Sequence, residues 1–590
     1  MSAFRAALAY DDLLRADANA AGANYAPVYY TEILSRLGLP HDTLAPAAIT
    51  AQTLEDYSAL LLPPLPPGHL SAEAVEAIAA WVETGGLLIG FATPGLGGVF
   101  GTDVVDLIVQ PGDEFTAAAC VRLNDPEWTR GLLPPYDQEC SIPIVAPVQV
   151  LSAPECRELA RLLTFFERDT GTPAITYRQV GRGAACYFAF DLGHCMLAMH
   201  QGRPVWEDYD GDGWLRTSDQ VATRPFPADV PYSDLLMFTL RRVIAEHGGV
   251  FLHQLPPTAD GAVPDAVFHW GGDDEGATDV QLPAAEFMAG LGLPYHVNIM
   301  PEPIGHHPLP RETFDRLTDL GCETSIHFNF ITDGRQPYAF NKDDLAEQLA
   351  AYQAAYDQTP VCTVFHCVTW TGWADPARWL AELGLKGDNN RLHRPFPPRN
   401  PTNKCSYAFG TAYPFHYYDD HAHQNGRIDF TSQPITAYEC GYVLNERAEF
   451  GQLHRAIEQA GFWHLTQNMF FHPIRLTEEH PRQAVQEVLD YCEVLGLNAL
   501  HFGTDELCLW WHARAASSVE PLADGGEGMT LRTRTDWPQG CIVQMLWQQD
   551  TPPVVVVNGQ PAGYLVREEY GCRWLYIACP TADAEVYVGK

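Results

Sequence analysis

Short apolar runs alternate with segments of helical periodicity through the first third of the chain. Residues 5–10, 58–62 and 87–91 are apolar runs typical of buried strands. Between the last two, Ser71 precedes a segment with apolar residues on one face that ends at two glycines, which predicts a capped helix. This alternation predicts an α/β fold over residues 1–250, with a mainly parallel, doubly wound sheet.

The pattern restarts after residue 261 and changes again near residue 520. Seven apolar strands separated by helical segments predict a distorted (β/α)7 barrel of parallel strands over residues 262–516, with its active site at the carboxyl ends of the strands. Short alternating strands with turn signals predict a small β-sandwich over residues 520–590. The strands expected in the barrel are 266–270, 295–300, 324–328, 361–368, 437–444, 464–471 and 498–502.

Length, charge and cysteine usage narrow the classes of function. A chain of 590 residues with 46% hydrophobic residues is expected to form about three globular domains. Its net charge of −38 would repel nucleic acids and anionic membranes, and no apolar run is long enough to span a bilayer. Fifteen cysteines without a CxxC pair suit free thiols, and the first residues lack a signal-peptide core, so we expect a cytoplasmic protein. The oligomeric state is not determined by the sequence.

The most informative motif is Gly271-Gly272-Asp273-Asp274, directly after the apolar run 267–270. Two neighbouring carboxylates at a strand's carboxyl end can divide the work of a hydrolase, because one can bind a divalent cation while the other takes a proton from water. The alternative is a polar turn, since glycine and aspartate are also favoured turn residues.

Three histidines follow later strands of the same predicted barrel. His327, His366 and His472 each stand at or next to a strand's carboxyl end. Together with the aspartate pair they would provide the nitrogen and oxygen ligands of a metal site. Each histidine taken alone is equally well explained as a core or surface imidazole.

At these residues the chain resembles the polysaccharide deacetylases, carbohydrate esterase family four, over about residues 262–510. The resemblance implies that Asp273 is the catalytic base, that Asp274 and His327 bind Zn²⁺ or another divalent transition metal, and that His472 is the acid. The family's second metal-binding histidine is replaced by Ile331 here. His366 is our substitute for it, and Asn329 or water is the alternative.

The N-terminal segment resembles the glutamine amidotransferase-like fold, chiefly in the helix that ends at residues 81–86 and in the strand after it. An amidotransferase needs a nucleophilic cysteine on a tight strand-to-helix turn. No Gly-x-Cys-x-Gly occurs in the first 250 residues. The resemblance therefore implies a catalytically silent domain that serves in binding or docking.

Candidate carbohydrate contacts come from Asn329 and from the aromatic residues Trp370, Tyr413 and Phe415, because aromatic rings offer flat faces to sugars. Ordinary core packing is the alternative for these rings. Residues 391–433 are long for a connection and rich in polar residues, so we expect a substrate lid there.

A second acidic motif comprises Asp208, Asp210, Asp212 and Asp219. These residues match loop positions 1, 3, 5 and 12 of a twelve-residue Ca²⁺ loop, with Gly213 at position 6. Arg216 at position 9 departs from that pattern. A solvated acidic turn is the other interpretation.

The sequence predicts a metal-dependent hydrolase that removes N-acetyl or other acyl groups from a carbohydrate. Two alternatives stay open at this point. One is a non-catalytic glycan-binding or scaffold protein with a decayed barrel, and the other is a metal-dependent carbon-nitrogen hydrolase with a smaller substrate.

Overall fold

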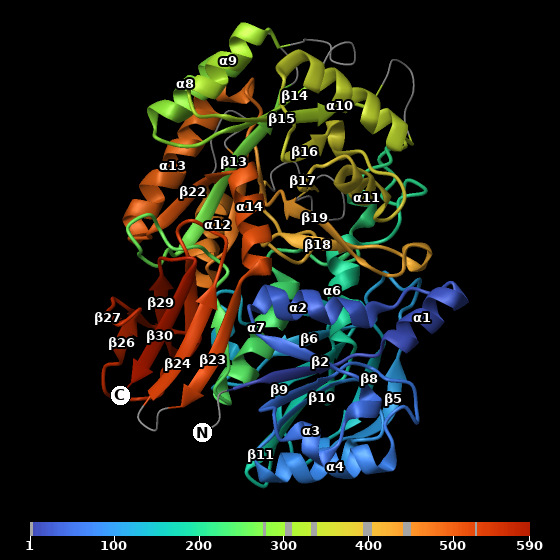
Figure 1. Ribbon diagram of the computed structural model, residues 1–590. Helices are drawn as coiled ribbons and strands as arrows, with labels where there is room; N and C mark the ends of the chain where they lie inside the picture. Colours follow the sequence, from blue (N-terminus) through green and yellow to red (C-terminus); the bar gives the residue numbers. More distant parts are fainter. Residues whose placement is uncertain are drawn as a thin grey trace.

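The computed structural model describes residues 4–274, 279–300, 309–331, 339–392, 404–440, 450–524 and 528–589. These residues form a mixed α/β structure with five sheets. In Figure 1 the central sheet and its helices lie above the N-terminal sheet, and the red C-terminal strands lie to one side. No helix among the described residues is long and apolar enough to cross a membrane.

The N-terminal sheet has nine strands in the order β2-β1-β3-β4-β11-β10-β9-β6-β7. Only the half from β2 to β11 is parallel, so the expectation of a mainly parallel sheet is wrong for the other half. The reversal begins at a tight hairpin in which Val180 pairs with Gly183, because so short a connection can join only antiparallel strands. The strands are β1 (Ala6–Ala9), β2 (His41–Leu44), β3 (Ala59–Leu62), β4 (Leu87–Phe91), β6 (Ala119–Leu123), β7 (Ile142–Ile144), β9 (Arg157–Thr164), β10 (Asp169–Val180) and β11 (Gly183–Phe188), with a separate pair β5 (Asp103–Ile108) and β8 (Val148–Ser152).

Helix α4 (Ala72–Thr84) begins and ends where the sequence signals it. Ser71 accepts a hydrogen bond from the Ala74 backbone N–H at the start of α4, and Gly85 follows its last residue. Burial of one helix face, which includes Ile78 and Val82, supplies the packing energy that keeps it on the sheet. The helices of the N-terminal part are α1 (Asp12–Ala21), α2 (Tyr29–Leu37), α3 (Ala51–Leu54), α4 (Ala72–Thr84), α5 (Gly97–Phe100), α6 (Leu192–Gln201) and α7 (Tyr232–Glu246).

The central sheet has ten strands, in the order β18-β19-β17-β16-β15-β14-β13-β21-β20, with β22 paired to β13. Every pairing is parallel except that of β18 with β19. The strands are β13 (Ala266–Asp273), β14 (His296–Ile299), β15 (Glu323–Phe328), β16 (Cys362–Phe365), β17 (Gly387–Arg391), β18 (Phe415–Tyr418), β19 (Arg427–Pro434), β20 (Ala437–Tyr438), β21 (Thr466–Phe470) and β22 (Ala499–Gly503). Their helices are α8 (Gln281–Gly290), α9 (Arg311–Asp319), α10 (Lys342–Tyr356), α11 (Asp375–Glu382), α12 (Gly451–Trp463), α13 (Glu479–Leu495) and α14 (Thr504–Ala516).

Each of the seven expected strand regions contains a strand of this sheet, but three further strands were missed. The expectation of a lid over residues 391–433 is wrong where β18 and β19 occupy it, and residues 393–403 lie outside the described part. The sequence of β17 is polar, and its buried Asp388 carboxylate accepts hydrogen bonds from both Ser432 and Tyr417. A search for apolar runs cannot find such a strand. The expected strand 437–444 is described only as far as residue 440.

Two antiparallel sheets form the C-terminal part, with the orders β12-β25-β29-β28 and β23-β24-β30-β26-β27. The edge strand β12 comes from the segment that joins the N-terminal and central sheets, so residues 520–590 do not build this part alone. The strands are β12 (Val250–Leu252), β23 (Ser518–Asp524), β24 (Gly528–Arg534), β25 (Cys541–Leu546), β26 (Val554–Val557), β27 (Gln560–Pro561), β28 (Leu565–Glu569), β29 (Cys572–Cys579) and β30 (Asp583–Gly589).

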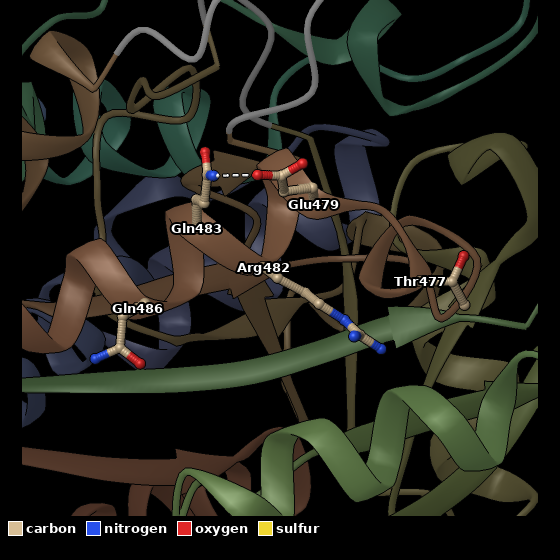
Figure 2. A pocket seen from close by; sticks show the side chains of 5 residues that line it. All are labelled: Thr477, Glu479, Arg482, Gln483 and Gln486. Atoms are coloured by element: carbon tan, nitrogen blue, oxygen red, sulfur yellow. Dashed lines mark hydrogen bonds between the residues drawn. The ribbon is translucent and has the colours of Figure 1, made fainter.

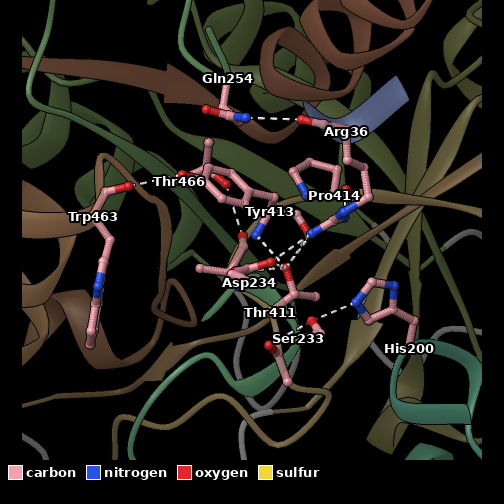
Figure 3. A network of polar contacts seen from close by, with 12 residues as sticks. Arg36, His200, Ser233, Asp234, Gln254, Thr411, Tyr413, Pro414, Trp463 and Thr466 are labelled. Atoms are coloured by element: carbon pink, nitrogen blue, oxygen red, sulfur yellow. Dashed lines mark hydrogen bonds and ion pairs between the residues drawn. The ribbon is translucent and has the colours of Figure 1, made fainter. Parts of the chain in front are cut away.

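Buried arginines join the three parts. The Arg36 guanidinium of α2 pairs with Asp234 of α7 at 2.8 Å and also donates to the Pro414 carbonyl of the central part (Figure 3). Arg514 of α14 donates to four carbonyls, those of Ser35, Arg36, Leu252 and His253, each at 2.9 Å. Because an unsatisfied buried charge is costly, these contacts hold the parts in one arrangement.

The Arg36–Asp234 pair yields a stability prediction. Changing Asp234→Asn leaves the buried Arg36 cation without its counter-charge, so we expect a loss of roughly 3–5 kcal/mol of unfolding free energy. Urea unfolding followed by tryptophan fluorescence measures it as a lower midpoint. The exposed pair of Arg311 with Asp315 provides the control, because D315N should change the midpoint little. Equal midpoints for D234N and wild type would contradict the prediction.

A second prediction concerns pH and the Glu569 carboxylate of β28. Glu569 accepts hydrogen bonds from His464, which follows α12, at 3.1 Å and from Tyr576 at 2.6 Å. Burial opposes its charge, but His464, Tyr576 and Arg567 outweigh that effect and lower the pKa of Glu569 to about 2. A carboxyl whose pKa is lowered by folding stabilises the fold above its unfolded pKa of about 4.5, and this stabilisation is lost as pH falls toward 2.

We therefore expect E569Q to be less stable than wild type by roughly 2–3 kcal/mol at pH 7. This difference in unfolding free energy between the two proteins should fall by about half or more by pH 3. Thermal unfolding of both proteins across this pH range measures the gap. D583N supplies a matched control, because Asp583 forms only an exposed ion pair with Arg534. The stability difference between D583N and wild type should not change in this way with pH. A gap of constant size from pH 7 to pH 3 would refute the assignment.

Candidate functional site

The aspartate pair lies where β13 ends. Residues 271–273 belong to the strand, so the alternative of a Gly-Gly-Asp turn is wrong for them. A Cβ at residue 272 would lie only 1.7 Å from the Phe471 carbonyl oxygen, which explains the glycine there. The same close approach lets Phe471 N–H donate to the Gly271 carbonyl at 2.8 Å and brings the end of β21 beside the pair. Asp273 and Asp274 are both buried.

The two carboxylates have different neighbours. Asp273 Oδ1 accepts a hydrogen bond from Asn298 Nδ2 at 3.1 Å and lies 3.7 Å from His327 Nδ1. Asp274 Oδ1 accepts a hydrogen bond from the Gln281 side chain, and its backbone N–H donates to the Asn298 carbonyl at 2.7 Å. The two carboxylates therefore have different hydrogen-bond partners, which would allow one to act as a base and the other to bind a metal.

His327 and His366 meet at the next strand ends. His327 is in β15, His366 directly follows β16, and their ring centroids are 5.4 Å apart. His366 Nδ1 lies 3.0 Å from Asn329 Oδ1, and Gln348 binds the backbone of Asn329 on both its N–H and its carbonyl. Asn329 thus links His366 to Gln348, and its expected contact with substrate stays a prediction.

His472 forms a buried pair with a residue that the sequence analysis missed. Its Nδ1 lies 2.6 Å from Glu439 Oε1, and Glu439 follows β20, the strand beside β21. Burial opposes the Glu439 charge, but the hydrogen bond from His472 and the nearby Arg475 keep its pKa below the ordinary value. The sequence does contain a signal for this pair, because Glu439 is a carboxylate within the otherwise apolar expected strand 437–444. A buried carboxylate needs a polar partner.

The described part of the chain contains four sets of three residues whose possible metal-ligand atoms lie within 4.8 Å of one another inside each set. Asp274, His327 and His366 are not one of these sets. The sets are His416, Asp429 and His512; His296, Glu323 and Asp505; Asp419, Asp420 and His423; and Asp208, Asp210 and Asp219.

The predicted aromatic substrate contacts are core residues. Trp370 stacks on Tyr417, the Tyr413 hydroxyl donates to the Trp463 and His464 carbonyls, and Phe415 stacks on His200. All three predicted aromatic side chains are fully buried. The expectation that their faces are open to a sugar ring is therefore wrong. The rings are buried because they pack against residues that are distant in the sequence.

Three of the four aspartates of the predicted Ca²⁺ loop converge. Asp208, Asp210 and Asp219 lie together, while Asp212 forms an ion pair with Arg216. Backbone N–H groups donate to each of the three, as in a polar turn. Burial raises the pKa of Asp219 to about 6. Ca²⁺ binding by this loop stays a prediction.

Two surface pockets are lined by described residues elsewhere. One, of about 390 Å³, lies at the start of α13 and is lined by Thr477, Glu479, Arg482, Gln483 and Gln486 (Figure 2). The other, of about 440 Å³, includes Lys386, Arg427, Asp429 and His512. Neither contains a residue of the predicted catalytic set.

No protein-family model matches the chain, and no curated protein matches it either. Among solved structures, the β-galactosidase of Bacillus circulans sp. alkalophilus is 20% identical, with a TM-score of 0.25, over 33% of this chain and 30% of that enzyme. The α-L-fucosidase isoenzyme 2 of Paenibacillus thiaminolyticus is 14% identical, with a TM-score of 0.28, over 43% of this chain and 35% of the fucosidase. A cytoplasmic protein of Salmonella typhimurium is 13% identical, with a TM-score of 0.24, over 36% of this chain and 85% of that protein.

The matched region spans only about a third of the length of the galactosidase. Likeness at these TM-scores carries no argument about the activity of this chain.

Proposed function

We propose that the chain is a metal-dependent hydrolase that removes an acyl group, with an acylated carbohydrate as substrate. The observation that supports the proposal is that Asp273, Asp274, His327, His366 and His472 lie at or next to the carboxyl ends of neighbouring strands, with His327 3.7 Å from Asp273 and its ring centroid 5.4 Å from that of His366. Strands β13 to β16 are consecutive neighbours there, and β21 lies on the other side of β13. The carbohydrate follows from the resemblance to the deacetylases and not from a contact in the site.

The donor chemistry at this edge fits a divalent transition metal. A carboxylate from Asp274 and imidazoles from His327 and His366 are ligands that Zn²⁺ accepts. Asn329 contacts Nδ1 of His366 and so leaves Nε2 as the nitrogen that would bind the ion, in the way that outer contacts orient metal-binding histidines. When bound, such an ion polarises the acyl carbonyl and lowers the pKa of a water molecule.

The remaining residues divide the proton transfers. Asp273, held by Asn298, takes a proton from the attacking water as the carbonyl carbon is attacked. His472 gives a proton to the departing nitrogen or oxygen, so that the bond to the acyl carbon breaks with a neutral leaving group. Glu439 keeps the His472 ring in place by accepting from Nδ1, which leaves Nε2 to act on the substrate.

Metal content tests the ligand assignment. The full-length protein, incubated with Zn²⁺ and freed of excess metal, should retain an ion that is lost in D274N and H366A. Elemental analysis by mass spectrometry measures the stoichiometry. H512A removes a ligand from the separate set at His416 and Asp429, so it should retain the ion of the proposed site. Equal zinc content in wild type and H366A would refute the role of His366.

The His472–Glu439 pair provides a kinetic prediction. With N-acetylated chito-oligosaccharides as probe, E439Q should lower the rate of acetate release by roughly tenfold, because the glutamine oxygen can still accept from Nδ1 but carries no charge to strengthen that bond. The alkaline limb of its pH profile should move to lower pH, because the carboxylate no longer stabilises the imidazolium. Zinc content should not change. As a control, E487Q alters the partly exposed His454–Glu487 pair and should leave the rate unchanged. No acetate release by the wild type would contradict the proposed function.

A further inference from the structure

Strand β14 carries two buried polar side chains on the face directed at the candidate site. His296 and Asn298 are two residues apart, so they lie on the same side of the strand. The register places Asn298 opposite Asp273 and His296 opposite Gly271. A Cβ at Gly271 would lie 3.0 Å from Thr504 Oγ1 and 3.3 Å from the His296 Cβ, so the glycine allows β14 and the start of α14 to approach β13 closely.

Both nitrogens of His296 face an acceptor. Nδ1 lies 3.0 Å from Glu323 Oε2 and 3.5 Å from Asp505 Oδ1, and Nε2 lies 3.1 Å from Asn298 Oδ1. The Glu323 carboxylate is itself held by the backbone N–H groups of Asp505 and Glu506 at the start of α14. The imidazole is thus clamped between two carboxylates and an amide.

This clamp determines which way the Asn298 amide points. Because Oδ1 faces His296, Nδ2 is directed at Asp273 Oδ1, at 3.1 Å, and at the Gly272 carbonyl, at 3.3 Å. The oxygen and nitrogen of an asparagine amide have nearly the same shape, so only the hydrogen bonds select between the two orientations. A flipped amide would place its oxygen against the Asp273 carboxylate, which is repulsive.

We propose that His296 is a positioning residue that acts through Asn298 to hold the Asp273 carboxylate in its working orientation. The inference rests on the proposed role of Asp273 as the base. The set His296, Glu323 and Asp505 then serves to orient the base of the candidate site.

The charge state of the ring supports this role. Burial disfavours the imidazolium, but Asp505 and Glu323 outweigh burial and raise the pKa of His296 to about 9. A protonated ring donates from both nitrogens, as the contacts with the carboxylates and with Asn298 require.

Two substitutions of His296 distinguish a role in positioning Asp273 from a general role in stabilising the fold. In H296L the ring donor is lost. In H296Q the side-chain amide can still donate to Asn298 Oδ1. For acetate release from N-acetylated chito-oligosaccharides, we expect H296L to lower kcat by roughly tenfold to a hundredfold, with KM within about twofold of wild type. H296Q should recover a large part of that loss, and zinc content should stay at the wild-type level in both.

Crystal structures of the two variants supply a readout that does not depend on activity. In H296L the Asn298 amide and the Asp273 carboxylate should leave their wild-type positions, and in H296Q they should keep them. N298L removes the same link without touching the Glu323–Asp505 pair, and it serves if H296L fails to fold. D315N, which alters the exposed Arg311–Asp315 pair, should match wild type in every measurement.

The proposal is overturned if Asp273 keeps its orientation in H296L or N298L, or if H296Q is no better than H296L. If the wild type releases no acetate, the proposed function fails, and the crystal structures alone decide whether His296 orients Asp273.

Discussion

The parallel alignment around β13 is the constraint on which the rest of the candidate site depends. β22 and then β14 pair along one edge of this strand, and β21 pairs along the other. Parallel strands deliver their carboxyl ends to one edge of a sheet, so side chains that are far apart in the sequence meet there. The glycine at residue 272 completes the arrangement, because a larger residue would collide with the Phe471 carbonyl and push β21 away.

Four of the candidate catalytic or metal-binding groups contact a buried partner that is not itself expected to react. Asn298 holds Asp273, Gln281 holds Asp274, Asn329 holds His366 and Glu439 holds His472. Buried polar groups are costly without partners and highly directional with them, so a connected set of them specifies one geometry. These four partner residues fix the orientation of the candidate catalytic and metal-binding side chains.

The N-terminal and C-terminal parts stabilise the central sheet through a few buried charges. Arg36 and Arg514 reach across all three parts and bind carbonyls at the ends of their elements. Because β12 belongs to a C-terminal sheet but precedes the central sheet in the chain, the three parts are interleaved rather than strung in sequence. The carboxylate of Glu569 adds a contact to His464, which lies just before β21 in the chain.

Local pattern in the sequence determined most strand and helix positions, together with the placement of the aspartate pair and of three histidines at strand ends. Hydrophobic periodicity is a property of neighbouring residues, so it found β13 and missed the polar β17. Only the tertiary structure decided that Trp370, Tyr413 and Phe415 are buried, that Glu439 faces His472, and that Asn298 lies opposite Asp273. Those facts depend on strand register and on contacts such as that of Val267 with Thr466, which are remote in sequence, and local periodicity contains no information about them.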